Sequence, residues 1–287
     1  MATDADTGPL LTELLREGAS ALAQAGVDAP RREAHRIWAD MTGTPTGDAA
    51  LHAAQRAGVE PTGRFRAAIA RRAAGEPLPY VTGVSGFRLL TLHADRRALI
   101  PRPETEGLVE LVLSQAPTGR VVDVGTGSGC IALALAQEGR YDSVVAVDRS
   151  ADALALASEN RQWTGIAIEL VRSDLLSAFA SERFDVVVSN PPYLTAGEYA
   201  ALDPSVRDWE PMAALPSGED GLDATCRLVE EARGRLRPGG LLALEVDASR
   251  AQDVAELGRT AGWTGVTVYY DLFGRARYVL ARRSKFS

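Results

Sequence analysis

The chain has 287 residues, enough for two domains of ordinary size, and its 46% hydrophobic and 24% charged residues are typical of globular proteins. The formal net charge of −7 argues against a nucleic-acid partner, because such proteins usually carry a basic face that neutralises phosphates. There is no apolar run long enough to span a membrane, no basic and apolar start typical of a secretory signal, and no disulfide or metal-ligand pattern among the two cysteines and three histidines. We therefore expect a cytoplasmic, monomeric protein that binds no membrane, metal or stable nucleic acid.

Residues 1–75 have the spacing of helices and show no strand alternation. Apolar residues recur at i, i+3 and i+4 between Leu11 and Leu22, and again on one face between Arg31 and Met41. Shorter helical pieces are predicted around 48–56 and 62–74, with glycines and a proline between them. This first domain is therefore predicted to be a small helical bundle.

Residues 76–100 differ from the bundle and are predicted to link two domains. The proline-rich stretch 75–80 comes first, and two runs with strand character follow it, Val84–Leu92 and Ala98–Ile100. Because residues 93–97 separate these runs, we expect a β-hairpin.

In residues 101–287 helical and strand patterns alternate. Strands are predicted at 121–124, 144–147, 166–171, 186–189, 241–246, 266–270 and 277–281, and helices at 104–114, 131–137, 151–161, 223–236 and 250–261. Strands separated by helices predict parallel βαβ units, which form a doubly wound α/β sheet with helices on both faces. The final strand should be antiparallel to its predecessor, because the connection 271–276 is too short for a crossover helix.

A glycine-rich turn, Gly125-Thr126-Gly127-Ser128-Gly129, connects the strand 121–124 to a helix. Asp148 follows Gly125 by 23 positions, at the end of the next predicted strand, where a carboxylate can accept hydrogen bonds from ribose hydroxyls. This order predicts a site for a nucleoside-containing ligand. Dinucleotide sites favour G-x-G-x-x-G, whereas the spacing here is G-x-G-x-G, which favours S-adenosylmethionine without excluding a dinucleotide.

The segment Asn190-Pro191-Pro192-Tyr193 follows another apolar strand and should lie at the same edge of the sheet as the glycine turn. An amide or aromatic amine nitrogen is a poor nucleophile, because its lone pair is delocalised. The Asn190 side-chain carbonyl and the Pro191 backbone carbonyl could accept hydrogen bonds from both N–H groups of such a nitrogen and aim it at a methyl donor. Tyr193 could stack on the flat face of the amide, so the motif predicts methyl transfer to a planar nitrogen.

These segments resemble the protein-(glutamine-N5) methyltransferases that modify peptide chain release factors. The resemblance covers nearly the whole chain, and its motifs lie at residues 75–83, 99–106, 123–129, 190–193 and 206–211. It implies a Rossmann-like methyltransferase sheet with an N-terminal helical bundle, S-adenosylmethionine as cofactor and translation release factors as protein substrates. The bundle would dock the substrate, whose methylated glutamine lies in a Gly-Gly-Gln loop.

The resemblance also implies roles for single residues. The methionine end of the cofactor would be lined by the glycine turn, Gly125, Thr126, Gly127, Ser128 and Gly129. Asp148 would hold the ribose. Leu175 would lie near the adenine. Asn190 would lie next to the cofactor's methyl group and bind the substrate amide, and Pro191, Pro192 and Tyr193 would complete the glutamine pocket. Asp247 stands where we would expect a glycine.

Several questions stay open at this point. The long connection 194–221 is predicted to be a lid over the glutamine pocket. Trp209 and Glu210 could be its anchor, or Trp209 could serve only in packing. Arg102 could face the cofactor site or pair with Glu104 or Glu106. Alternative functions are an amino-methyltransferase acting on a ribosomal-protein glutamine or a nucleic-acid base, an NAD-dependent oxidoreductase, and a binding module without catalysis.

Overall fold

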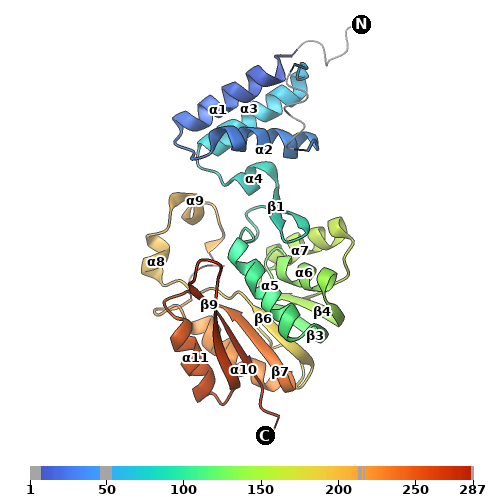
Figure 1. Cartoon of the computed structure of the whole chain (residues 1–287), viewed down its shortest axis with the longest axis vertical. Helices are drawn as coiled ribbons and strands as arrows, with labels where there is room; N and C mark the ends of the chain where they lie inside the picture. The colour runs from blue at the N-terminus through green and yellow to red at the C-terminus, as the bar shows by residue number, and fades with distance from the viewer. Residues whose placement is uncertain (1–7, 46–53, 213–214, 216, 286–287) are drawn as a thin grey trace. The chain divides into compact units, whose positions relative to one another are not determined.

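The computed structural model describes residues 8–45, 54–212, 215 and 217–285 (Figure 1). The chain forms two compact units. The helical unit contains residues 1–84 and 203–209, and the sheet unit contains residues 85–202 and 210–287.

The helical unit has one apolar core. Its helices are α1 (Leu11–Gln24), α2 (Pro30–Thr42), α3 (Val59–Ala73), α4 (Leu78–Thr82) and α9 (Pro204–Arg207). Leu14, Leu22, Ile37 and Phe65 are fully buried in this core, and the Trp38 ring meets the Phe65 ring edge-on with 5.8 Å between centroids. Burial of this apolar stripe stabilises helices that would be marginal in isolation.

The segment after α3 is tied back to that helix by arginines. Arg71 binds the Glu76 carboxylate and donates to the Tyr80 carbonyl at 3.0 Å. Arg72 donates to the Glu76 carbonyl at 3.3 Å and also pairs with Glu33 of α2 at 2.6 Å. The contacts to residues 76 and 80 fix the start of α4, a helix that was not predicted because five residues are too short to show a helical period.

The sheet unit contains seven strands in one sheet, in the order β5-β4-β3-β6-β7-β9-β8 (Figure 1). Its strands are β3 (Thr118–Val124), β4 (Arg140–Asp148), β5 (Glu169–Arg172), β6 (Phe184–Ser189), β7 (Leu236–Glu245), β8 (Thr264–Tyr270) and β9 (Ala276–Arg282). The pairs from β5 to β7 are parallel, and β9 is antiparallel to both β7 and β8. The predicted fold class, a mostly parallel α/β sheet with an antiparallel last strand beside a helical bundle, is confirmed.

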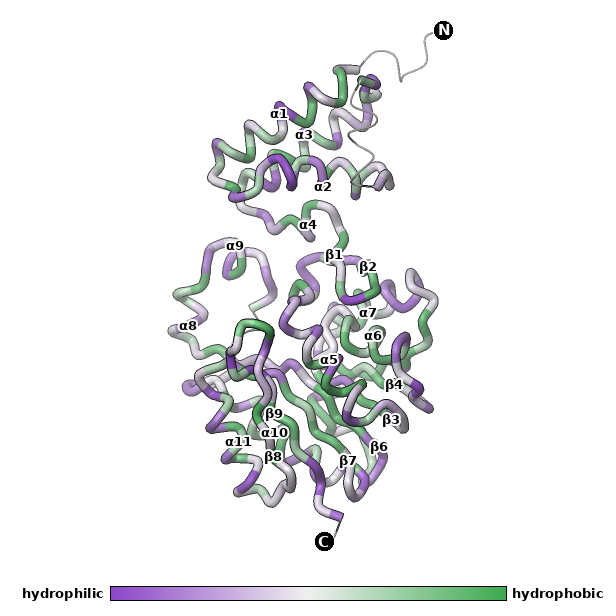
Figure 2. Tube along the Cα trace, in the orientation of Figure 1, coloured by the Kyte–Doolittle hydropathy of each residue, from purple (hydrophilic) through white to green (hydrophobic). Residues whose placement is uncertain are grey.

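Helices cover both faces of the sheet, and side chains alternate between the two cores as strand geometry requires. Val121 and Val186 face α5 (Pro103–Gln115) and α6 (Cys130–Glu138). Val122 and Val187 face α10 (Asp223–Arg235) and α11 (Ala251–Thr260). Helix α7 (Ala151–Thr164) connects β4 to β5, and α8 (Ala196–Ala200) follows β6. Figure 2 shows the hydrophobic positions concentrated along the central strands.

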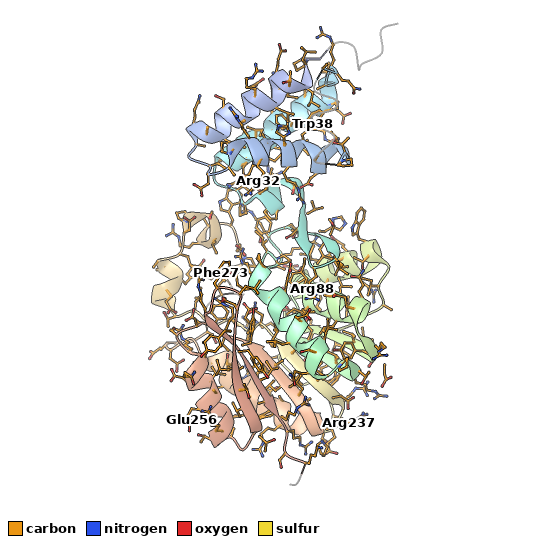
Figure 3. The ribbon with its side chains drawn as sticks, in the orientation of Figure 1. Arg32, Trp38, Arg88, Arg237, Glu256 and Phe273 are labelled. Atoms are coloured by element: carbon orange, nitrogen blue, oxygen red, sulfur yellow. The ribbon has the colours of Figure 1, made fainter. Side chains whose placement is uncertain are left out.

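The β8–β9 hairpin ends in an exposed tip. Phe273 is 75% exposed there (Figure 3), and the Arg275 guanidinium lies 5.7 Å from the centre of its ring. Asp271 accepts hydrogen bonds from the backbone N–H groups of Phe273 and Arg275, which closes the turn.

The linker hairpin was predicted with the wrong strands. Its strands are β1 (Val84–Phe87) and β2 (Leu90–His93), which together occupy almost the same residues as the single first strand that was predicted. That segment forms two strands because Arg88 takes a left-handed conformation (φ 50°) and turns the chain. Ala98–Ile100 is not a strand. Arg88 is held by ion pairs to Glu138 at 2.6 Å and Glu110 at 2.9 Å (Figure 3).

Two further boundaries were also misplaced. Strand β7 begins at Leu236, which pairs with Phe184, so residues 237–240 lie inside a strand where a break was predicted. The helical piece predicted around 48–56 lies mostly outside the described residues, and residues 54–56 form a turn and a bridge between Arg56 and Leu10. In the described part of the chain, no helix is long and apolar enough to cross a membrane.

Two helical glycines give a matched test of packing in the bundle. A Cβ atom at Gly18 of α1 would lie 2.7 Å from the ring of the buried Phe65, whereas one at Gly63 of α3 would meet no described atom within 4 Å. Gly18→Ala should therefore destabilise the unit by about 1–3 kcal/mol through overpacking. Gly63→Ala should stabilise it by roughly 0.5–1 kcal/mol through helix propensity. Denaturant unfolding followed by circular dichroism measures both, and equal stability of the two variants would contradict this packing.

Candidate active site

The carboxyl ends of the parallel strands gather the predicted site residues at one edge. Val124 of β3 pairs with Val147 of β4 and with Ser189 of β6, and Ser189 pairs with Leu244 of β7. The residues that follow these positions therefore emerge side by side. The strand order reverses between β3 and β6, and ligands of doubly wound sheets bind at such a switch point.

The glycine turn needs glycine for its backbone geometry. Gly125, Gly127 and Gly129 have φ values of 72°, 57° and 83°, which strain residues that carry a Cβ atom. The N–H groups of Gly125 and Thr126 both donate to the Val147 carbonyl, at 2.8 and 2.9 Å. The turn is thereby fastened to the end of β4.

A buried carboxyl group holds the turn from inside. Asp123 Oδ2 accepts hydrogen bonds from the Thr126 hydroxyl at 2.6 Å and from the Ala132 N–H at 3.2 Å. Asp123 is fully buried, and burial raises its pKa to about 7. Its Oδ1 atom has no hydrogen-bond partner among the residues that the structure describes. Asp123 belongs to one of the motifs of the resemblance, but no role was predicted for it.

Asp148 is held by two backbone N–H groups. Its Oδ2 accepts from Gly127 at 3.0 Å, and its Oδ1 accepts from Ser150 at 2.9 Å. Each carboxylate oxygen has a second lone pair, so Asp148 can still accept hydrogen bonds from a ligand. The carboxylate is therefore oriented before any ligand binds.

Asn160 of α7 is a further support that the sequence analysis missed. Its side chain is fully buried, donates to the Ser128 carbonyl at 2.9 Å, and accepts from the His93 N–H at 2.6 Å. It thus connects the glycine turn to β2. A lone asparagine inside a helix gives no local signal for such a role, which depends on contacts 32 and 67 residues away.

A cavity of about 210 Å³ opens at this edge of the sheet. Of the predicted site residues it is lined by Gly125, Thr126, Gly127, Ser128, Asp148, Leu175, Asn190 and Pro192. Gly129, Pro191 and Tyr193 do not line it. Pro191 is buried, and burial of the Tyr193 ring raises the pKa of its hydroxyl to about 12.

Segment 97–105 forms a wall of the cavity, and of its residues only Arg102 had been predicted as a possible neighbour of the cofactor. Ile100, Pro101, Arg102 and Thr105 all line it. Arg102 does face the cavity, but its ion-pair partner is neither of the two predicted glutamates. Its Nη2 atom lies 2.6 Å from Glu210 Oε1, and Glu210 Oε2 accepts from the Ile100 N–H at 3.2 Å.

The structure also shows the surroundings of the predicted lid anchor and of Asp247. Glu210, whose side chain is 1% exposed, anchors the end of segment 194–210 to the cavity wall, whereas Trp209 belongs to the helical unit. Asp247, which stands where a glycine was expected, accepts from the Ser249 N–H at 2.8 Å and so closes a turn after β7.

Asn190 lies next to the first turn of α5. Its side-chain Nδ2 donates to Thr105 Oγ1 at 3.2 Å, and both residues line the cavity. With the amide nitrogen directed at Thr105, the amide oxygen is the end that remains for another partner. The site can therefore offer a carbonyl acceptor beside a cavity that is bounded by the glycine turn and Asp148.

The buried Asp123 gives a testable pH dependence. Its folded-state pKa of about 7 exceeds the ordinary value of about 3.9, so the stability that its protonated form contributes is present at low pH and is lost as the pH rises to 7. Asp123→Asn removes this dependence. As the pH rises from 4 to 8, the unfolding free energy of the unmodified protein should fall by on the order of 3 kcal/mol more than that of the variant. Denaturant unfolding at several pH values measures this difference, and parallel curves for both proteins would contradict the assignment.

Comparison with known proteins identifies relatives over both units. Two family models match the chain, a PrmC N-terminal domain at residues 13–83 and a methyltransferase small domain at residues 104–203. The release factor glutamine methyltransferase of Cereibacter sphaeroides is 43% identical over 94% of this chain and 97% of its own length. That of Deinococcus radiodurans is 40% identical over 96% of this chain and 99% of its own length.

A solved structure shares the fold. The 16S rRNA N2 G1207 methyltransferase of T. thermophilus, in complex with AdoMet and guanosine, has a TM-score of 0.52 at 20% identity, covering 70% of this chain and 49% of that chain. This likeness concerns the fold alone. The sequence relatives confirm the family that the motifs predicted: the chain belongs to the release factor glutamine methyltransferases.

Proposed function

We propose that this protein transfers a methyl group from S-adenosylmethionine to the side-chain nitrogen N5 of the glutamine in the Gly-Gly-Gln loop of translation release factors. The observation that carries this proposal is the similarity to release factor glutamine methyltransferases across almost the full length of both chains. The similarity includes the helical unit as well as the sheet unit. Methyltransferases that share only the reaction would need to resemble this chain only in the sheet unit.

The cavity fits S-adenosylmethionine. A Cβ atom at Gly125 would meet no described atom within 4 Å, so a ligand can lie directly against the main chain there. Asp148 is oriented to accept hydrogen bonds from ribose hydroxyls, and Leu175 offers an apolar surface for the adenine. When bound, the cofactor supplies a methyl group on a positively charged sulfur.

The chain's own residues supply acceptors and orientation for the glutamine amide. Asn190 Oδ1 accepts one N–H of the glutamine carboxamide, and the Pro191 carbonyl accepts the other. These bonds concentrate electron density on the nitrogen and hold its lone pair toward the methyl group. In this proposal Pro192, which lines the cavity, and Tyr193, which does not, complete the pocket for the flat carboxamide. Because the acceptors do this work, no strong base is needed before methyl transfer. The methylated nitrogen then releases one proton to solvent, and S-adenosylhomocysteine is the other product.

The remaining parts of the chain serve access and docking. Residues 1–75 dock the release factor, residues 76–100 link the two domains, and segment 194–221 closes over the glutamine. Near the start of this segment, α8 is capped by Thr195 and Glu198, and Arg250, just before α11, pairs with Glu198 at 2.8 Å. The protein acts as a monomer in the cytoplasm, where its substrate is made.

The function is tested by mass spectrometry of purified release factor incubated with the protein and S-adenosylmethionine. We expect one added methyl group, on the glutamine of the Gly-Gly-Gln peptide. A release factor in which that glutamine is replaced by glutamate is the control and should stay unmodified. Methyl transfer to nucleic acid or to a ribosomal protein, with the release factor unchanged, would contradict the proposal.

The role of Asn190 is tested by Asn190→Ala. Loss of the acceptor carbonyl should lower kcat by about 10²–10³-fold, the range seen when one preorganised hydrogen-bonding group is removed. Calorimetric binding of S-adenosylhomocysteine should change little, because the glycine turn and Asp148 are untouched. A variant that keeps near-normal turnover would rule out this role.

A further inference from the structure

Leu175 has an unusual backbone conformation for a leucine. Its φ angle is 47°, in the left-handed region that residues with a Cβ atom rarely adopt. Leu175 lines the cavity, whereas the next residue, Leu176, is fully buried in the core on the α10 face of the sheet. The left-handed turn thus lets two consecutive apolar residues serve a cavity and a core. Such a strained conformation persists only where neighbouring contacts hold it.

The contacts that hold this turn come from one row of side chains on α10. Arg227, Glu231 and Arg235 are spaced four residues apart, so they lie along one side of the helix. Glu231 Oε2 accepts a hydrogen bond from the Leu176 N–H at 3.0 Å. Arg235 Nε donates to the Leu176 carbonyl at 3.3 Å. Helix α10 therefore binds both backbone polar groups of the residue that follows the strained one.

Arg227 connects the same row to the residue before Leu175. Its Nη2 atom lies 2.7 Å from Asp174 Oδ2 and 3.5 Å from Glu231 Oε1, and both Arg227 and Asp174 line the cavity. The side chains of Arg227 and Asp174 are more than half exposed, so water screens their ion pair and the pair contributes little. The Glu231 side chain is only 25% exposed, and its bond to the Leu176 N–H is charge-assisted. Glu231 is therefore the member of the row on which the turn depends.

We propose that Glu231 is a positioning residue for the cofactor, which holds Leu175 in its left-handed conformation and so keeps an apolar wall ready for the adenine ring. Without Glu231, the Leu176 N–H loses its acceptor, and Leu175 can relax into an ordinary conformation. The wall would then have to form during binding, which lowers affinity. This inference rests on the proposed function, because it takes S-adenosylmethionine as the ligand of the cavity.

Three substitutions in α10 test this role by calorimetric binding of S-adenosylhomocysteine. Glu231→Ala removes the acceptor, and the dissociation constant should rise on the order of tenfold, the effect of about one hydrogen bond. Glu231→Gln keeps a carbonyl oxygen for the Leu176 N–H, so the dissociation constant should stay within about threefold of the unmodified value. Glu230→Ala is the matched control and should change nothing, because Glu230 is the adjacent acid of the same helix and is exposed.

A shorter ligand shows which end of the cofactor Glu231 affects. 5′-Methylthioadenosine keeps the adenine and the ribose but lacks the amino-acid portion. Because the turn at Leu175 contacts only the adenine in this proposal, Glu231→Ala should weaken binding of both ligands by the same factor. Loss of affinity for S-adenosylhomocysteine alone would mean a disturbance at the methionine end and would overturn the role. Unchanged binding of both ligands, or an equal loss in Glu230→Ala, would overturn it as well.

A double-mutant cycle tests whether Glu231 acts through Leu175. Glycine adopts positive φ angles freely, so Leu175→Gly removes both the strain and the apolar wall. This variant should bind S-adenosylhomocysteine on the order of tenfold more weakly, through loss of apolar contact. In that background Glu231→Ala should add less than about twofold, because no side chain remains to be positioned. If Glu231→Ala had the same effect in both backgrounds, it would act independently of Leu175 and the proposal would be wrong.

Hydrogen exchange of the Leu176 amide provides a readout without ligand or substrate. In the ligand-free protein this amide should exchange slowly in the unmodified chain and in Glu231→Gln, and faster in Glu231→Ala. Alanine favours helices, so Glu231→Ala should keep the circular dichroism spectrum of the unmodified protein. If the binding and exchange results hold while release factor is not methylated, the proposed substrate fails and the positioning role stands. Unchanged exchange in Glu231→Ala would overturn the positioning role even in an active enzyme.

Discussion

Parallel pairing of β4, β3, β6 and β7 is the constraint on which the site depends. Because equivalent residues pair across these strands, their carboxyl ends coincide, and Gly125, Asp148, Asn190 and Glu245 emerge at one edge. Four strands at the usual spacing span about 14 Å. That length suits a cofactor over β4 and β3 and an acceptor amide over β6. The alternating apolar faces bury the sheet between helices and keep this edge rigid.

Two buried carboxyl groups lie at this edge of the sheet. Asp123 accepts a hydrogen bond from the Thr126 hydroxyl and so orders the glycine turn, and Glu245 is buried at the end of β7. In each case burial raises the pKa to about 7, so the acid destabilises the folded state at high pH. Sites commonly retain such costly groups where orientation matters more than stability.

The sequence predicted what local patterns encode. A strand followed by glycines located the turn, a strand followed by Asn-Pro-Pro located Asn190, and a short final connection predicted the antiparallel edge. The partners of these groups were not predictable, because they are distant in the sequence. Arg102 pairs with Glu210, 108 residues away, and Asn190 with Thr105, 85 residues away. No periodicity indicates which side chains tertiary packing will bring together. The linker hairpin was misplaced for a related reason. The residues after Arg88 keep the composition of a strand, but the positive φ of Arg88 ends the first strand there.

The orientation of Asn190 is the central claim, because the reaction needs a carbonyl oxygen at that point and the surrounding contacts direct it there. The most direct measurement is a crystal structure of the enzyme with S-adenosylhomocysteine and a glutamine-bearing release-factor peptide, at a resolution that distinguishes nitrogen from oxygen. The account predicts Asn190 Oδ1 about 2.7–3.2 Å from the glutamine side-chain nitrogen, with Nδ2 still donating to Thr105. An Asn190 side chain turned away from the glutamine, or with its nitrogen facing it, would contradict the account.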